Sequence, residues 1–374
     1  MDEVVVIGYG TAKRKDITGS VASVNSETLA AIPVASATEA LQGKMAGVQI
    51  TTTEGSPDAQ MSIRVRGGGS ITQSNEPLFI VDGFPVESIS DIPPTDIESI
   101  DVLKDASSTA IYGARGANAV IIVTTKSGKE GKVSVSYNAY YAWKKVAKTL
   151  DVLSASDYTK WQYELAQLTN KNDDYIKYFG NYQDLDMYDN VATNDWQDLT
   201  FGRTGHSFNH NLSINGGSDK FKYSFSYSHI DDKAIMQMSD YARDNLNLKL
   251  NHKPLKNVSL DFSARFSKTK INGGGSNDAN SSLNTDKRLK YSLLYTPYPV
   301  PGISDALNAD EEDANSLLIN PLISLRDNDT RKERINYNLA GSITWEIIKD
   351  LKLKAEVGYD DYRTNADRYY CILY

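Results

Sequence analysis

Hydrophobic and polar residues alternate with a period of two along much of the chain after Gly131. In Phe221–Ser228, for example, Phe and Tyr alternate with Lys and Ser. This is the period of a β-strand, whose successive side chains point to opposite faces of a sheet. The pattern predicts seven strands, at residues 133–141, 206–215, 221–228, 245–251, 258–267, 335–345 and 351–359.

Short and long connections between these strands alternate strictly. The short ones lie around Gly216–Asp219, Lys253–Lys256 and Ile348–Asp350, and the long ones span Lys144–Gly205, Asp231–Tyr241 and Thr269–Arg334. A transmembrane barrel sorts its connections in this way, with short turns at one rim and long loops at the other. A secreted β-sandwich also alternates apolar and polar residues, and it is the alternative. The order of the loops favours the barrel.

The chain before Gly131 has the texture of a small α+β domain. A capped helix is predicted at Ser36–Met45 and a helical turn at Ala106–Tyr112. Between them, Gly and Pro separate short apolar runs. These runs predict strands at residues 48–52, 61–65, 77–81, 97–103 and 119–125.

The first long connection contains a predicted helix at Ser154–Leu168, which begins with a capping residue. Its spacing puts four apolar residues on one stripe, namely Tyr158, Trp161, Leu165 and Leu168. The stripe has two interpretations: contact with a ligand or partner, or packing of the loop against its neighbours.

Composition narrows the class of protein. Hydrophobic residues make up 40% of the chain and the mean hydropathy is −0.44. The longest apolar run, Ala119–Val123, is far shorter than the ~20 residues of a membrane-spanning helix. A net charge of −8 argues against nucleic-acid binding. The 23 Tyr residues suit a surface that is apolar at one end and wet at the other.

Catalytic, cofactor and metal signatures are missing from the sequence. It contains no G-x-S-x-G, P-loop or H-E-x-x-H motif, and Gly8-Tyr9-Gly10 lacks the third glycine of a dinucleotide site. His206 and His210 would lie ~13 Å apart on a strand, too far to share an ion. Cys371 is the single cysteine, which excludes an internal disulfide. We therefore expect neither an enzyme nor a bound cofactor or metal, although calcium binding by loop carboxylates stays open.

Several segments together resemble one family. Residues 2–10, DEVVVIGYG, resemble the TonB box of the SusC/RagA-like TonB-dependent outer-membrane receptors. Four further segments resemble the plug of these receptors, namely Leu41–Val48, Ile63–Gly67, Pro77–Pro85 and Ile97–Lys126. The later strands, including Asn245–Leu250, are similar to the start of the family's barrel. The resemblance covers essentially the whole chain.

The resemblance implies an α+β plug domain followed by antiparallel transmembrane β-barrel strands. The domains would be the TonB box and linker at residues 1–11, the plug at 12–130 and the first part of the barrel, with long extracellular loops, at 131–374. Family members continue through about 22 strands, so the seven strands here imply an incomplete barrel. They also carry a signal peptide and usually a small β-domain before the box. No signal peptide is visible after Met1, so we expect that the exported protein begins upstream or that the chain has been trimmed.

The resemblance also implies two sets of site residues. The TonB-binding set is Asp2, Glu3, Val4, Val5, Val6, Ile7, Gly8 and Tyr9. Its β-branched centre suits the addition of a strand to a partner's sheet, although an ordinary first strand or a frayed tail is the alternative. The plug-motif set is Arg64, Arg66, Gly67, Asp82, Gly83, Glu98, Lys104, Tyr112, Gly113, Arg115 and Gly116.

The plug cations Arg64, Arg66, Lys104 and Arg115 are expected to bond to carboxylates of the barrel wall or of neighbouring plug segments. Plain surface solubility is the alternative. Arg64 and Arg66 are separated by one residue, which would put them on the same face of a strand. The plug glycines are expected to serve tight turns and close packing.

The function implied by the resemblance is import of a large nutrient, an oligosaccharide or a peptide, across the Gram-negative outer membrane. The implied partners are TonB with its ExbB-ExbD motor, a SusD-like lipoprotein and outer-membrane lipid, but no nucleic acid. The plug and the amino terminus would face the periplasm. The alternatives are a receptor for siderophores or cobalamin, and a surface glycan-binding protein or adhesin that transports nothing.

Overall fold

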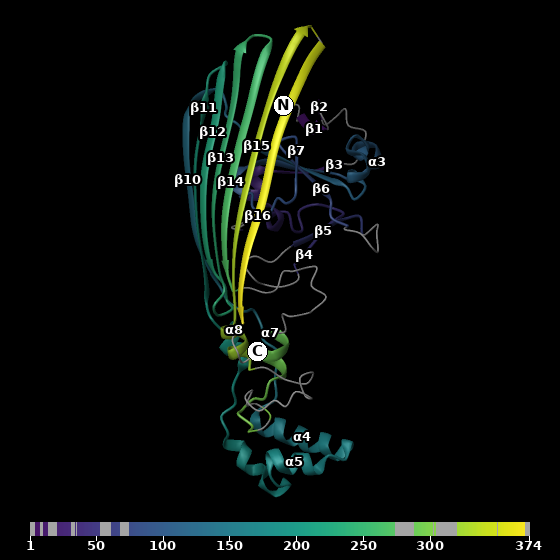
Figure 1. Ribbon diagram of the computed structural model, residues 1–374, viewed down its shortest axis with the longest axis vertical. Coiled ribbons are helices and arrows are strands. Elements are labelled where there is room, and N and C mark those ends of the chain that lie inside the picture. The colour runs from purple at the N-terminus through teal and green to yellow at the C-terminus, as the bar shows by residue number, and fades with distance from the viewer. Residues whose placement is uncertain are drawn as a thin grey trace.

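The computed structural model describes residues 4–7, 10–13, 21–30, 34, 36–52, 61–67, 75–273, 288–301, 303, 320–349 and 351–370. Its largest element is an antiparallel sheet, here called the wall sheet, in which each strand pairs with the next along the chain (Figure 1). The wall sheet is open, because its first and last strands form its two edges. Its strands are β10 (Gly131–Lys144), β11 (Gly205–Gly217), β12 (Phe221–Lys233), β13 (Asp240–Leu255), β14 (Val258–Asn272), β15 (Asn328–Ile348) and β16 (Leu351–Tyr370).

All seven predicted strands are present, but most of them are longer than the alternation indicated. β15 begins at Asn328 rather than at residue 335, and β16 continues to Tyr370. In these extensions both faces carry polar residues, so the pattern no longer marks a strand while the ladder continues. β12 and β13 also extend beyond the alternating residues, so the connection between them is shorter than expected.

The two faces of the wall sheet differ as the alternation predicted. Tyr227 lies in one ladder row with Leu212 and Leu246 on the outer face, and all three keep part of their surface exposed. Ser224, Ser226 and Ser228 point inward and are buried. The inner face is the one that the amino-terminal domain contacts.

The amino-terminal domain, here called the plug domain, contains a five-stranded sheet in the order β3-β8-β9-β6-β7. Its strands are β3 (Val21–Asn25), β8 (Ile97–Leu103), β9 (Val120–Thr125), β6 (Leu78–Val81) and β7 (Phe84–Val86). A separate hairpin joins β4 (Val48–Thr52) to β5 (Met61–Val65). Branched apolar residues of the two central strands, including Ile100, Val102 and Ile121, are completely buried and form its core.

The helices of the plug domain are short, namely α1 (Ser26–Ala30), α2 (Ala37–Ala40), α3 (Ala106–Thr109), η2 (Pro94–Asp96) and η3 (Ala110–Gly116). Ser36 caps α2 by accepting the amide of Glu39 at 3.1 Å. The helix predicted at Ser36–Met45 is wrong beyond Ala40, where the chain continues in turns. Gly43 and Gly47 have positive φ there, a conformation that leaves the helix.

The two longest connections pack together as one unit beyond the end of the wall sheet, here called the loop unit (Figure 1). Tyr298 and Thr159 share a hydrogen bond of 2.6 Å between their hydroxyls, and the Trp196 indole donates to the carbonyl of Thr296. The elements of this unit are α4 (Ala155–Thr169), α5 (Asn172–Phe179), η4 (Tyr182–Asn190), α6 (Trp196–Phe201), α7 (Arg288–Leu294) and α8 (Pro321–Asp327).

The predicted helix in the first long connection is confirmed as α4. Its apolar stripe is divided, because Tyr158 packs in the aromatic core of the loop unit while Leu168 is 83% exposed. Trp161 and Leu165 are exposed as well. Within the described residues, no helix combines the length and the apolar character needed to cross a membrane.

Gly113 provides a test of the plug fold. Its backbone has φ 58° and ψ −146°, a region that only glycine adopts without strain. We expect Gly113→Ala to lower the opening free energy of β9 by about 1–3 kcal/mol. Hydrogen exchange of the amides of Val120–Thr125 measures this loss. The neighbouring exposed substitution Ala114→Ser should change it by less than about 0.5 kcal/mol, and equal effects would contradict the interpretation.

Candidate functional site

The amino-terminal segment forms a hairpin. β1 (Val4–Ile7) pairs antiparallel with β2 (Gly10–Lys13), and the two form a sheet of their own. Among the described residues, the other edge of β1 has no ladder partner. Four members of the predicted TonB-binding set, Asp2, Glu3, Gly8 and Tyr9, lie outside the described residues. Both earlier interpretations, an ordinary first strand and a strand offered to a partner, are compatible with this hairpin.

One turn of the plug domain contacts the wall sheet through its carboxylate. Asp82 and Gly83 both have positive φ and form the tight turn between β6 and β7. The Asp82 carboxylate accepts hydrogen bonds from the Thr125 amide at 2.9 Å and from the Thr125 hydroxyl at 2.6 Å. Lys249 of β13 donates to the same carboxylate at 2.9 Å and to the Thr125 carbonyl at 3.2 Å. Asp82 therefore joins two plug strands to the wall sheet.

The surroundings of Asp82 favour its ionised form. Burial alone would raise the pKa of this carboxyl, and it is the largest single influence. The positive charges of Lys249 and Arg265 and the hydrogen bonds from Thr125 together outweigh it, so the pKa lies below its usual value. The Asp82 and Lys249 side chains are only 11% and 21% exposed, so their ion pair is well shielded from water.

A second plug carboxylate, Asp96, also contacts the wall sheet, but its surroundings favour the protonated form. Its side chain accepts hydrogen bonds from the Ser226 hydroxyl at 2.8 Å and from the Asn211 amide at 3.4 Å. Burial is the largest influence, and it raises the pKa of Asp96 in spite of these hydrogen bonds and of the charges of Lys126 and Arg243. Asp96 thus accepts a proton more readily than Asp82.

Two arginines of the wall sheet reach the same part of the plug domain. Arg243, only 2% exposed, donates to the Ser90 carbonyl at 2.8 Å. Arg334 lies 3.7 Å from the Asp91 carboxylate, and both side chains are largely buried. The contacts of Asp82, Ser90, Asp91 and Asp96 with the wall sheet are here called the seam.

An aromatic contact completes the seam on the far side of the Asp82 turn. Phe84 packs on β16 at Gly358, where an added Cβ would lie 2.4 Å from the ring. Gly358 shares one ladder row with Ala340, Ser263 and Lys249. The row is thus charged at Lys249 and has small residues toward β16, which leaves room for the plug hairpin.

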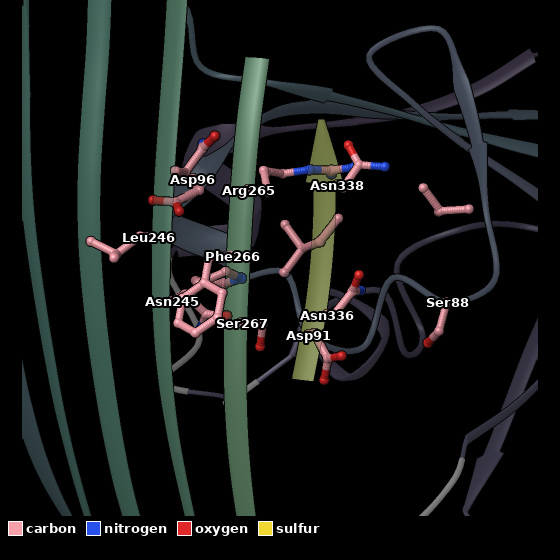
Figure 2. A pocket seen from close by; sticks show the side chains of 14 residues that line it. Ser88, Asp91, Asp96, Asn245, Leu246, Arg265, Phe266, Ser267, Asn336 and Asn338 are labelled. Atoms are coloured by element: carbon pink, nitrogen blue, oxygen red, sulfur yellow. The ribbon is translucent and has the colours of Figure 1, made fainter. Parts of the chain in front are cut away.

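Cavities remain between these contacts. One of about 40 Å³ lies among Asp91, Asp96, Arg265 and several asparagines (Figure 2). Three of its lining side chains, Asn247, Arg265 and Asn336, each have a buried polar atom without a hydrogen-bond partner in the described part of the chain. A second cavity of about 400 Å³ lies beside Asp82, Lys249 and Glu356. The seam is therefore a set of separate polar contacts and not a continuous apolar core.

The plug cations do not make the expected contact with the wall sheet. Arg66 pairs with Asp105 at 3.1 Å and donates to the Lys104 carbonyl, while Lys104 donates to the Ala46 carbonyl. These contacts lie within the plug domain. The pair with Asp105 agrees with the prediction that the plug cations bond to carboxylates of the barrel wall or of neighbouring plug segments. Arg64 and Arg115 are exposed and form no ion pair with a described residue. The polarity at the seam is reversed: plug carboxylates meet wall cations.

The expectation that Arg64 and Arg66 share a strand face is wrong. β5 ends at Val65, and Arg66 has a left-handed backbone with φ 57°. That turn directs Arg66 toward Asp105.

The other plug-motif residues lie away from the wall sheet or serve the plug fold. Glu98 forms an exposed ion pair with Lys129, and Tyr112 packs on a small apolar cluster. Gly116 approaches the Thr109 carbonyl so closely that a Cβ would lie 2.8 Å from it, and Gly67 has φ 93°.

Sequence reasoning missed most residues of the seam, namely Asp91, Asp96, Arg243, Lys249, Arg265 and Arg334. A signal for the wall cations was present in the alternation. Lys249, for instance, stands at the inward positions of its strand together with Asn245 and Asn247. No comparable local pattern marks Asp91 or Asp96.

The two carboxylates predict different costs of neutralisation. We expect Asp82→Asn to weaken plug docking by about 3 kcal/mol, because it leaves Lys249 without its counter-charge in a shielded site. Asp96→Asn should cost less, because burial already disfavours the charge of Asp96. Hydrogen exchange of the plug strands measures both costs. In a double-mutant cycle with Lys249→Gln, an additive result for Asp82→Asn would contradict a direct coupling.

The lowered pKa of Asp82 predicts how docking of the plug domain depends on pH. Because the pKa of Asp82 is lowered in the folded state, its contribution to docking is fully present above the ordinary carboxyl pKa of 3.8. It is lost as the pH falls through the lower folded value. We expect acid to loosen the seam in the wild type, and to do so much less in Asp82→Asn. The same exchange measurement, made as a pH series, tests this.

Comparisons with known proteins agree with this architecture. The model of the TonB-dependent Receptor Plug Domain matches residues 13–120. The chain is 40% identical over 253 residues to the TonB-dependent receptor SusC of Bacteroides thetaiotaomicron, covering 65% of this chain and 24% of that protein. It is 33% identical to the TonB-dependent receptor P3 of Formosa agariphila, over 99% of this chain and 35% of that protein.

A solved structure shows the same arrangement. The structure of the RagAB peptide importer in its open-open state superposes with a TM-score of 0.77 and 27% identity, over 97% of this chain and 43% of that chain. The chain thus spans about a quarter to a third of the length of the curated relatives it matches. With its plug domain seated on an open antiparallel wall sheet, the chain belongs to the SusC/RagA-like TonB-dependent receptors.

Proposed function

We propose that the chain is the gated part of a transporter that imports a large nutrient across the outer membrane. The plug domain obstructs the inner face of the wall sheet, and the seam holds it there. The observation that carries this proposal is the contact of Asp82 with both Thr125 and Lys249, which ties the plug domain to the wall sheet through a few polar bonds. Such bonds can be exchanged for bonds to water when the plug moves.

The plug requires a force that moves it, and we assign the site of that force to β1. Its apolar, β-branched residues Val4–Ile7 form a short strand with one edge unpaired among the described residues. A partner strand can add to such an edge through main-chain hydrogen bonds, which transmit tension along the chain. By family membership the partner is TonB, driven by its ExbB-ExbD motor. The plug and the amino terminus would then lie on the periplasmic side.

The loop unit lies at the end of the wall sheet opposite the short turns, and in this proposal it faces the outside. Its exposed aromatic and aliphatic residues, such as Trp161 and Leu165, suit contact with a ligand or a partner protein. We propose an oligosaccharide or a peptide as the ligand and a SusD-like lipoprotein as the partner. RagAB, a similar protein, is a peptide importer.

Two rival functions make different predictions. A siderophore or cobalamin receptor would depend on TonB in the same way but would take up a different ligand. A surface glycan-binding protein or adhesin would keep its binding after deletion of residues 2–10, whereas a transporter would lose uptake. Measuring glycan adhesion and nutrient uptake in the same deletion strain separates transport from adhesion.

Proline scanning tests the role of β1 in the complete receptor. Val5→Pro or Val6→Pro removes a backbone donor and fixes φ, which disrupts an added strand. We expect nutrient uptake to fall at least about tenfold while insertion into the outer membrane stays normal. Ala12→Pro is the matched control, because it alters β2 and leaves the backbone donors of β1 in place. Normal uptake in the β1 variants, or an equal loss in Ala12→Pro, would contradict the proposal.

A further inference from the structure

The apolar outer face of the wall sheet ends abruptly at the short-turn rim. The last outward apolar residues there belong to several strands and are exposed, namely Phe221, Leu255, Trp345, Ile348 and Leu351. Ile348, for example, is 63% exposed. A band of this kind, with aromatic residues at its border, is the surface that a barrel presents to the interior of a bilayer. Its border marks the depth at which lipid headgroups begin.

Each short turn places a lysine directly beyond this border. Lys220 precedes Phe221, Lys256 follows Leu255, and Lys349 follows Ile348. All three are exposed, and none forms an ion pair with a described residue. Three cations therefore stand in a row along the rim, within one or two residues of the apolar border. This row is here called the lysine rim.

The opposite border of the band has a different mixture of charges. Its outward charges are of both signs: Lys268 pairs with Glu333 at 3.3 Å and Arg363 pairs with Asp361 at 2.8 Å. His229 likewise lies 2.8 Å from Asp244. Lys233 and Lys270 are exposed there and form no ion pair with a described residue, and the same holds for Asp231. The two borders thus differ in composition: the long-loop border carries outward charges of both signs, whereas lysine predominates at the short turns. In the sequence, two acidic residues neighbour these lysines, Asp219 beside Lys220 and Asp350 beside Lys349, and Lys253 adds a further cation.

We propose that Lys220, Lys256 and Lys349 bind the phosphate groups of anionic phospholipids in the leaflet around the short-turn rim. A lysine at this depth keeps its aliphatic stem on the apolar border and extends its ammonium group to the headgroups. Juxtamembrane lysines attract anionic lipid through the same electrostatics, which salt screens. The lysine rim would fix the depth of the wall sheet in the bilayer. This inference rests on the membrane location in the proposed function but not on the ligand or on TonB.

Lipid selectivity measures this binding directly. The complete receptor is reconstituted in phosphatidylcholine vesicles with a trace of spin-labelled phosphatidylglycerol or phosphatidylcholine, and the motionally restricted fraction of each label is compared. For the wild type we expect a preference for phosphatidylglycerol of about fivefold at low salt, reduced in high salt. The triple variant Lys220→Gln, Lys256→Gln, Lys349→Gln should show a ratio near one.

Two controls make the result specific. Lys160→Gln, Lys171→Gln, Lys177→Gln removes the same charge from the loop unit and should leave the lipid preference unchanged. Replacing the three rim lysines with Arg should preserve it. The proposal is overturned if the wild type shows no preference, if the rim variant keeps it, or if the loop-unit control loses it equally. If the wild-type receptor takes up no nutrient but shows the lipid preference and its dependence on the rim lysines, the proposed function fails while the lysine rim stands.

Discussion

The ion pair between Asp82 and Lys249 fixes how the plug domain and the wall sheet fit together. The carboxylate is already bonded to Thr125, so the pair links the edge hairpin of the plug, its central strand β9 and the wall sheet at one point. Separating two charges in a shielded site costs far more than separating them in water, which keeps the plug seated. Further contacts between the plug domain and Ser226, Arg243 and Arg334 of the wall sheet surround this point.

The wall sheet can support this seam because its two faces carry different chemistry. A one-residue slip in strand register would send every apolar side chain inward and every polar one outward. The alternation therefore serves two surfaces at once: an outer band suited to lipid, and an inner face with serines, asparagines and cations that can bond to the plug domain. The same register that buries Ser226 beneath the plug leaves Tyr227 on the outer face.

The seam differs from an ordinary domain core in the cost of opening it. An apolar core would have to expose hydrophobic surface, whereas separate polar groups recover hydrogen bonds to water. The cavities among Asp91, Asp96 and Arg265 reduce the packed contact further. Phe84 against Gly358 is the apolar exception, and it is a single ring. The seam therefore keeps the plug domain in place, and a force applied to the amino terminus can still separate it from the wall sheet.

The sequence by itself determined the elements and their faces. Period-two alternation located all seven wall strands, the loop order predicted their antiparallel succession, and the capped stripe at residues 154–168 predicted α4. These are local properties, set within a few residues. The sequence also indicated the family, through long motifs in the plug.

Tertiary structure alone decided which charges meet. Asp82 and Lys249 are separated by 167 positions, and no local pattern could pair them. The sequence left open whether Arg66 would meet a carboxylate of the wall sheet or of the plug domain, and its left-handed backbone after β5 directs it to Asp105 of the plug domain. The strands are also longer than the alternation predicted, because ladder hydrogen bonds continue where both faces of the sheet carry polar residues. Periodicity fixes the direction of a side chain, whereas its partner depends on register and on how two folded units dock.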